Sequence, residues 1–183
     1  MVALIIILVI IAAIVLYVVS TYNNLVSLRN KVNDQWSQID VELKRRFDLI
    51  PNLVETVKGY AKHEKETLEN VIKARNSYLT AGTKEQALNA DKELNGALSR
   101  LLVTVEQYPD LKANQSFLDL QAQLKDTEDK ISFARKFYND TALKLNNAVE
   151  MFPSNLIANT FKFTKVEYFK ADEEEKENVK VEF

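Results

Sequence analysis

The first nineteen residues, Met1 to Val19, form an unbroken apolar run without a charged side chain, proline or glycine. As an α-helix this run would be about 28 Å long, which matches the roughly 30 Å hydrocarbon core of a bilayer. A cleaved signal peptide would have a basic start and a small-residue cleavage site, and a soluble core helix would have a polar stripe. Neither feature is present, so the pattern predicts a transmembrane anchor over residues 1–20.

Beyond the anchor, apolar residues recur at helical spacing in four stretches. The first contains two interleaved series of residues seven apart, as in helices that pack in bundles, and no helix-breaking residue separates it from Val19. We therefore expect this helix to continue the transmembrane helix. Short connections favour an up-down arrangement, so the sequence predicts an all-α fold, an antiparallel four-helix bundle over residues 21–159. The predicted helices cover about residues 21–47, 52–79, 84–107 and 115–151.

Proline and glycine set the predicted boundaries. A proline inside a helix removes a backbone hydrogen bond, so Asp48–Pro51 is interpreted as a turn. Gly82 ends the second helix, and Thr83 is an expected N-cap with Gln86 as its capping-box partner. Tyr108 to Asn114 forms the next connection, at the membrane-distal end with Asp48–Pro51. The connection at Thr80–Thr83 is expected at the membrane-proximal end.

Residues 160–183 form a separate C-terminal segment. Its alternating part predicts a surface strand packed on the bundle or, with equal weight, an interfacial segment whose aromatic side chains meet lipid headgroups. The candidate lipid-interface residues are Phe161, Phe163, Tyr168 and Phe169. The acidic stretch from Asp172 to Glu177 is predicted to be disordered.

Composition narrows the function classes. The chain has 24 Lys and Arg against 26 Asp and Glu, so it has no basic excess for binding nucleic acid. It contains no cysteine, which excludes disulfides and thiolate chemistry. Di-iron sites in bundles need a Glu-x-x-His on each of two helices, but the chain has one histidine, His63. We find no phosphate-binding loop or nucleophile motif, and therefore expect no enzyme activity, cofactor or metal site.

A basic cluster marks a candidate partner-binding tip. Lys44, Arg45 and Arg46 complement a helix C-terminal dipole if the first bundle helix ends near residue 47. They would then stand beside the other distal connection and form a charged and aromatic tip suited to a protein partner. The predicted tip consists of Lys44, Arg45, Arg46, Tyr108, Asp110 and Lys112.

Several polar residues fall at or near the apolar stripes. Buried polar groups in bundles fix register and partner choice. We predict a buried polar network in which Glu128 and Arg135 pair with Asp40 and Lys44 of the first helix; the alternative is that these residues face water. Asn139 and Asn146 belong to the same class of polar positions.

The distribution of charge around the anchor predicts its orientation. No Lys or Arg precedes the anchor, whereas Arg29, Lys31 and the cluster at residues 44–46 follow it. By the positive-inside rule, the bundle is expected in the cytoplasm and the N-terminus outside.

The segment from Tyr22 to Glu64, YNNLVSLRNKVNDQWSQIDVELKRRFDLIPNLVETVKGYAKHE, resembles the signature of the bacterial LemA family. It is followed by ENVIKAR, YPDLKAN, TEDKISFARKFYN and FP in the family's order. One departure is Asp34-Gln35 before Trp36, where many relatives have alanine. The resemblance implies a single-pass membrane helix carrying a helical bundle, in a family without an established biochemical activity. Some relatives are linked to magnetosome membrane formation.

Together these features predict a membrane-tethered interaction or scaffold protein of the bacterial cell membrane. Its expected partners are the bilayer, through residues 1–19, and unidentified proteins, with a homo-oligomer as a further possibility. The alternative is a membrane-remodelling or lipid-surface-binding protein that uses the segment after residue 160. An enzyme is the third and least favoured class.

Overall fold

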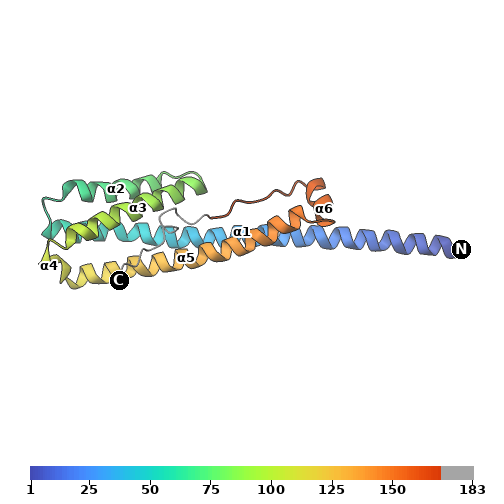
Figure 1. Cartoon of the computed structure of the whole chain (residues 1–183), viewed down its shortest axis with the longest axis horizontal. Helices are drawn as coiled ribbons and strands as arrows, with labels where there is room; N and C mark the ends of the chain where they lie inside the picture. The colour runs from blue at the N-terminus through green and yellow to red at the C-terminus, as the bar shows by residue number, and fades with distance from the viewer. Residues whose placement is uncertain (170–183) are drawn as a thin grey trace, which may run out of the picture. The chain divides into compact units, whose positions relative to one another are not determined.

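A computed structural model describes residues 1–169, which fold into helices joined by short connections and end in an extended segment (Figure 1). The described helices are α1 (Val2–Tyr60), α2 (Lys65–Leu79), α3 (Lys84–Val105), α4 (Pro109–Lys112), α5 (Gln115–Glu150) and α6 (Ser154–Thr160). This confirms the all-α class and the helical bundle. Lys170 and the predicted disordered stretch from Asp172 to Glu177 lie outside the described residues.

Helix α1 does not end near residue 47. It continues through Pro51 to Tyr60, so the prediction of a turn at Asp48–Pro51 is wrong. Pro51 is exposed, whereas Phe47, Ile50 and Leu53 around it are at most 2% exposed. Burial of such side chains contributes about 1.5–3 kcal/mol each, which offsets the roughly 3 kcal/mol cost of a proline inside a helix. The actual turn lies at residues 61–64, and α2 begins at Lys65.

The later boundaries follow the sequence more closely. Helices α3 and α5 begin at the predicted residues 84 and 115 and end at Val105 and Glu150. The hydroxyl of Thr83 accepts a hydrogen bond from the backbone N–H of Gln86, which confirms the N-cap. The side-chain carbonyl of Gln86 accepts from the N–H of Gly82 at 2.8 Å, one residue before the usual partner in a capping box.

The described chain divides into two compact units. One unit contains residues 1–38 together with the chain from residue 133 onward, and the other contains residues 39–132. The division between residues 38 and 39 falls within α1, and the division between residues 132 and 133 falls within α5. Each of these two helices therefore contributes to both units. We describe each unit by itself.

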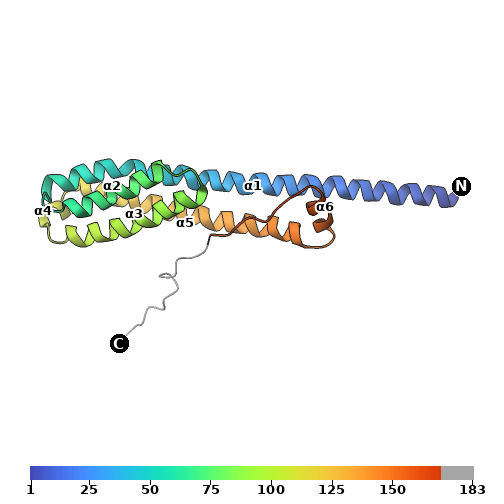
Figure 2. The ribbon, with the colours of Figure 1, turned by 90° about the horizontal axis from the view of Figure 1, so that it is seen from above.

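The unit of residues 39–132 contains the second part of α1, α2, α3, the short α4 and the first part of α5. Its longer helical segments run antiparallel to their neighbours along the chain (Figure 2). The ring of Phe47 stacks on that of Tyr78, with centroids 4.1 Å apart. Tyr78, close to the end of α2, also donates to Asp40 of α1 at 3.3 Å. Because α2 is 15 residues long, the connection at Thr80–Thr83 lies near residue 40 of α1, at the opposite end of this unit from the turn at residues 61–64.

The other unit contains the apolar start of α1, the second part of α5, α6 and the extended segment 161–169. Within the part of the chain that the structure describes, one helix is long and apolar enough to cross a membrane, and its apolar window lies at the N-terminal end of α1. None of that window is buried against protein. This is the single candidate membrane span over residues 1–169.

Candidate functional site

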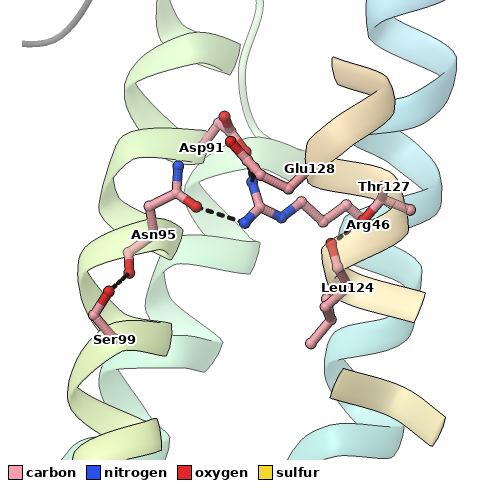
Figure 3. Close-up of polar contacts among 7 residues, drawn as sticks. All are labelled: Arg46, Asp91, Asn95, Ser99, Leu124, Thr127 and Glu128. Carbon is pink, nitrogen blue, oxygen red and sulfur yellow. Dashed lines mark hydrogen bonds and ion pairs between the residues drawn. The ribbon is translucent and has the colours of Figure 1, made fainter. Parts of the chain in front are cut away.

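The most buried charged cluster of the unit of residues 39–132 is centred on Arg46 of α1 (Figure 3). The guanidinium of Arg46 donates to Asp91 at 2.7 Å and to the side-chain carbonyl of Asn95 at 2.5 Å, both on α3. It also forms an ion pair with Glu128 of α5. Arg46 is 4% exposed and Asp91 is fully buried. We call Arg46, Asp91, Asn95 and Glu128 the Arg46 cluster.

The Arg46 cluster joins three helices through a single side chain. Buried charges are tolerated when they are paired and hydrogen-bonded, because an unpaired charge in the interior is strongly unfavourable. Two carboxylates face one guanidinium, so the cluster has a formal excess of one negative charge. Glu128 is less buried than its partners, with 37% of its side chain exposed. The excess negative charge of the cluster therefore lies next to solvent.

Three members of the cluster, Arg46, Asn95 and Glu128, line a cavity of about 410 Å³. The cavity lies between α1, α3 and α5, and most of its wall is apolar: Leu53, Leu98, Leu101, Leu102, Phe117 and Leu124. Its volume is within the range of small-ligand pockets, roughly 300–1,000 Å³. The cluster contains no imidazole or thiol to act as a nucleophile or base. This arrangement can hold an apolar group with a polar end, and it lacks the ordinary parts for covalent catalysis.

Tyr78 of α2 lies outside the cavity lining and donates a hydrogen bond to Asp40 of α1. Burial, together with the charge of Asp40, raises the pKa of Tyr78 to about 12. The hydroxyl therefore stays protonated at physiological pH and remains a donor to Asp40. This contact links α2 to α1 and has no role as an acid or base near neutral pH.

The six residues of the predicted partner-binding tip do not form one surface. Arg46 is buried, and Arg45 lies 3.9 Å from both Glu42 and Asp126. Lys44 is exposed. The tip prediction fails because α1 runs on to Tyr60 instead of turning beside the basic cluster.

Residues of the other predicted tip segment gather at the turn after α1. The hydroxyl of Tyr108 donates to Glu64 at 3.0 Å, and Asn114 donates to the hydroxyl of Tyr60 at 2.9 Å. Lys112 pairs with Glu106, and Asp110 is exposed in the first turn of α4. These contacts fasten the α1–α2 turn to the segment around α4.

The predicted buried network also has different partners from those expected. Glu128 pairs with Arg46 and not with Lys44, which is exposed, and Asp40 accepts from Tyr78. The guanidinium of Arg135 lies 5.8 Å from the ring centroid of Phe169. Asp91 was missed altogether. The feature of the sequence that could have identified Asp91 is its position between Ala90 and Leu94, because a carboxylate there falls on the apolar face of α3.

The predicted lipid-interface residues divide into two pairs. Phe163 is 7% exposed and packs against Tyr22, while Phe169 stacks on Trp36. Phe161 and Tyr168 remain 50% and 43% exposed. Phe161 also contacts protein, since its ring centroid lies 4.7 Å from that of Tyr22, but about half of its surface stays exposed, as it does for Tyr168.

Comparison with known proteins identifies the chain's relatives. The model of the LemA family matches residues 35–183. Protein LemA of Metamycoplasma hominis is 27% identical over 158 residues, which cover 86% of this chain and 72% of that protein. Magnetosome protein MamQ of Magnetospirillum gryphiswaldense and magnetosome protein MamQ 2 of Paramagnetospirillum magneticum are each 26% identical over 174 residues. These matches cover 81% of this chain and 64% of each MamQ protein.

Proposed function

The chain belongs to the LemA family, and from this premise we propose that it is a membrane-tethered helical module that binds other proteins and has no catalytic activity of its own. One observation carries the proposal. The 59 residues of α1 include both the exposed apolar span and buried core residues such as Leu25, Ile39 and Leu43. Anchor and fold are thus parts of one helix, which suits a protein that holds binding surfaces at a membrane.

The absence of catalytic activity is supported by the chemistry of the site. The Arg46 cluster offers a guanidinium, two carboxylates and an amide that already bind one another. Acyl and phosphoryl transfer need a positioned nucleophile or metal beside a base. The single histidine, His63, is exposed in the turn between α1 and α2.

A second candidate function is binding to a lipid surface. It is favoured by the exposed rings of Phe161 and Tyr168 and by the similarity to proteins named as magnetosome proteins. The tether proposal differs from it in one respect, since it requires the apolar span alone for membrane attachment. We further propose, from the basic residues that follow the span, that the bundle faces the cytoplasm.

Replacing Ile6 and Ile11 together with arginine is expected to release the protein from membranes. Each arginine near the centre of a membrane helix costs about 2.5–3.5 kcal/mol, so two should prevent stable insertion. The measurement is flotation of the full chain after cell-free synthesis with phosphatidylcholine liposomes. The wild type should float, and the double variant should remain at the bottom of the gradient.

The matched control places the same two charges outside the span. Val41 and Val103 are 63% and 70% exposed, so a Val41→Arg/Val103→Arg chain should float like the wild type. A further arm, Phe161→Ala/Tyr168→Ala, separates the two functions. Full flotation of this variant supports the tether, whereas its loss from the floating fraction would favour the lipid-surface protein.

A further inference from the structure

Apolar side chains are exposed together just after α5 and along α6. Met151 and Phe152 directly follow the last residue of α5, and 78% of the surface of Phe152 is exposed. Leu156 of α6 and Phe161 at the end of α6 are exposed as well. No residue from Met151 to Phe161 carries a charge. We call Met151, Phe152, Leu156 and Phe161 the α6 patch.

The other side of α6 is fixed to the fold. Ile157 and Ala158 are buried. The helix ends in a Schellman cap, in which the N–H of Phe163 donates to the carbonyl of Ala158 at 2.9 Å and Lys162 takes the left-handed φ of 58°. The chain then turns back, so that Phe163 is buried. The α6 patch is therefore held in place on the outside of its unit.

A ring contact places the α6 patch beside the point where α1 leaves its apolar span. The ring centroid of Phe161 lies 4.7 Å from that of Tyr22, and Figure 1 and Figure 2 both show α6 next to α1. Tyr22 follows Val19, the last residue of the apolar run, by a rise of about 4.5 Å. Leu25 is the first fully buried residue of α1. The patch thus lies within about one helical turn of the end of the span.

The charges of both segments fit a membrane boundary at this level. The first charged side chain of α1 is that of Arg29. After α6, the first charged side chains are those of Lys162 and Lys165. Aromatic residues are enriched at membrane interfaces, and Lys and Arg concentrate on the adjoining aqueous side. An uncharged surface with two phenylalanines, bordered by lysines, has the composition of an interfacial segment.

We propose that the α6 patch is a second membrane contact, which lies in the interface of the same bilayer that the apolar span crosses. This inference rests on the proposed function, because the span must cross the membrane for the patch to reach it. Lipid around the end of the span meets the patch without any movement of the protein. The span supplies the attachment, and the patch sets the depth at which the unit that contains it meets the bilayer.

The rest of the extended segment 161–169 lies farther from the end of the span. The amide of Asn139 on α5 donates to the carbonyl of Phe169 at 2.9 Å and accepts from its N–H at 2.8 Å. The segment therefore runs back along α5. The rise of α5 from Asn139 to its last residue, Glu150, is about 16 Å. Tyr168, next to Phe169, is thus too distant to belong to the lipid contact, although its ring is exposed.

Quenching of tryptophan fluorescence by brominated lipid tests the contact. The chain has one tryptophan, Trp36. Full chains that carry Trp36→Phe and Phe152→Trp are reconstituted in vesicles of phosphatidylcholine with bromine atoms on the upper part of the acyl chain. We expect at least about a twofold loss of fluorescence relative to vesicles without bromine, because interfacial helices bury their apolar face at this depth. Leu156→Trp, in the same background, should show the same loss.

Two control positions complete the test. Phe137 is an exposed phenylalanine of the same unit, about 20 Å from the end of α5 by helix rise. Phe137→Trp in the same background should keep its fluorescence. Leu16→Trp lies within the apolar span and reports whether the tether itself is in the bilayer.

The outcomes at these positions separate the two proposals. Quenching at position 16 without quenching at positions 152 and 156 would leave the tether in place and overturn the α6 contact. The absence of quenching at all of these positions would overturn both proposals. Equal quenching at positions 137 and 152 would also overturn the α6 contact, because α5 would then lie along the bilayer surface.

Discussion

Replacing Arg46 with alanine is expected to lower the melting temperature of the unit of residues 39–132 by at least about 10 °C. The variant leaves the carboxylate of Asp91, which is fully buried, without the guanidinium that lies 2.7 Å away. Loss of one partner from a buried ion pair costs about 3–5 kcal/mol. In a domain of 60–100 residues, each kcal/mol corresponds to about 4–8 °C. Thermal unfolding followed by circular dichroism of the full chain in detergent measures the effect.

Two matched variants separate burial from charge. Arg45 is the neighbouring arginine, but half of its side chain is exposed and its ion pairs are 3.9 Å long. Arg45→Ala should therefore cost less than about 1 kcal/mol. The double variant Arg46→Met/Asp91→Leu removes both charges and should recover most of the lost stability. Equal melting temperatures for Arg46→Ala and Arg45→Ala would show that the Arg46 cluster does not hold the three helices together.

The second large effect is expected for Phe47→Ala. Phe47 is 1% exposed, and its ring stacks on Tyr78 with an interplanar angle of 7°. Truncating a buried phenylalanine costs about 3–5 kcal/mol, from lost transfer free energy and the cavity that remains. The variant should melt at least about 10 °C below the wild type in the same experiment, and α2 should become the first helix to lose protection from proteolysis.

Phe137 is the appropriate control for Phe47, because it is the same residue type on α5 with 57% of its surface exposed. Exposed substitutions of this kind change stability by about 0.5 kcal/mol. A Phe137→Ala chain that melts as low as Phe47→Ala would contradict the assignment of Phe47 to the core.

The sequence was sufficient for the fold class and for the helix starts at residues 84 and 115, because apolar periodicity and the Thr83 cap act locally. It failed at Pro51, where the local rule for proline competes with the burial of Phe47, Ile50 and Leu53. No local pattern shows that the burial of neighbouring side chains will outweigh the cost of a proline inside the helix. That single error displaced the predicted turn, made the predicted second helix begin at residue 52 instead of Lys65, and placed the basic cluster beside the segment around α4.

The site was less predictable than the fold for a related reason. The apolar pattern identifies Glu128 as a polar residue near the core. With a helix end predicted near residue 47, its partner Arg46 is assigned to the helix C-terminus instead of to the core. Asn139 and Asn146 stood out as polar positions of the same kind. Their partners are backbone groups of residues 166 and 169, and side-chain pairing rules do not predict contacts with backbone.

The central claim is that the membrane span and the bundle share one unbroken helix, α1. Hydrogen–deuterium exchange of the full chain in bilayer nanodiscs tests it most directly. The structure predicts slow exchange from residue 5 through Tyr60, including residues 20–24 and 48–52, with fast exchange first appearing in the turn at residues 61–64. Fast exchange at residues 20–24 or 48–52, or over the apolar span within the bilayer, would contradict the claim.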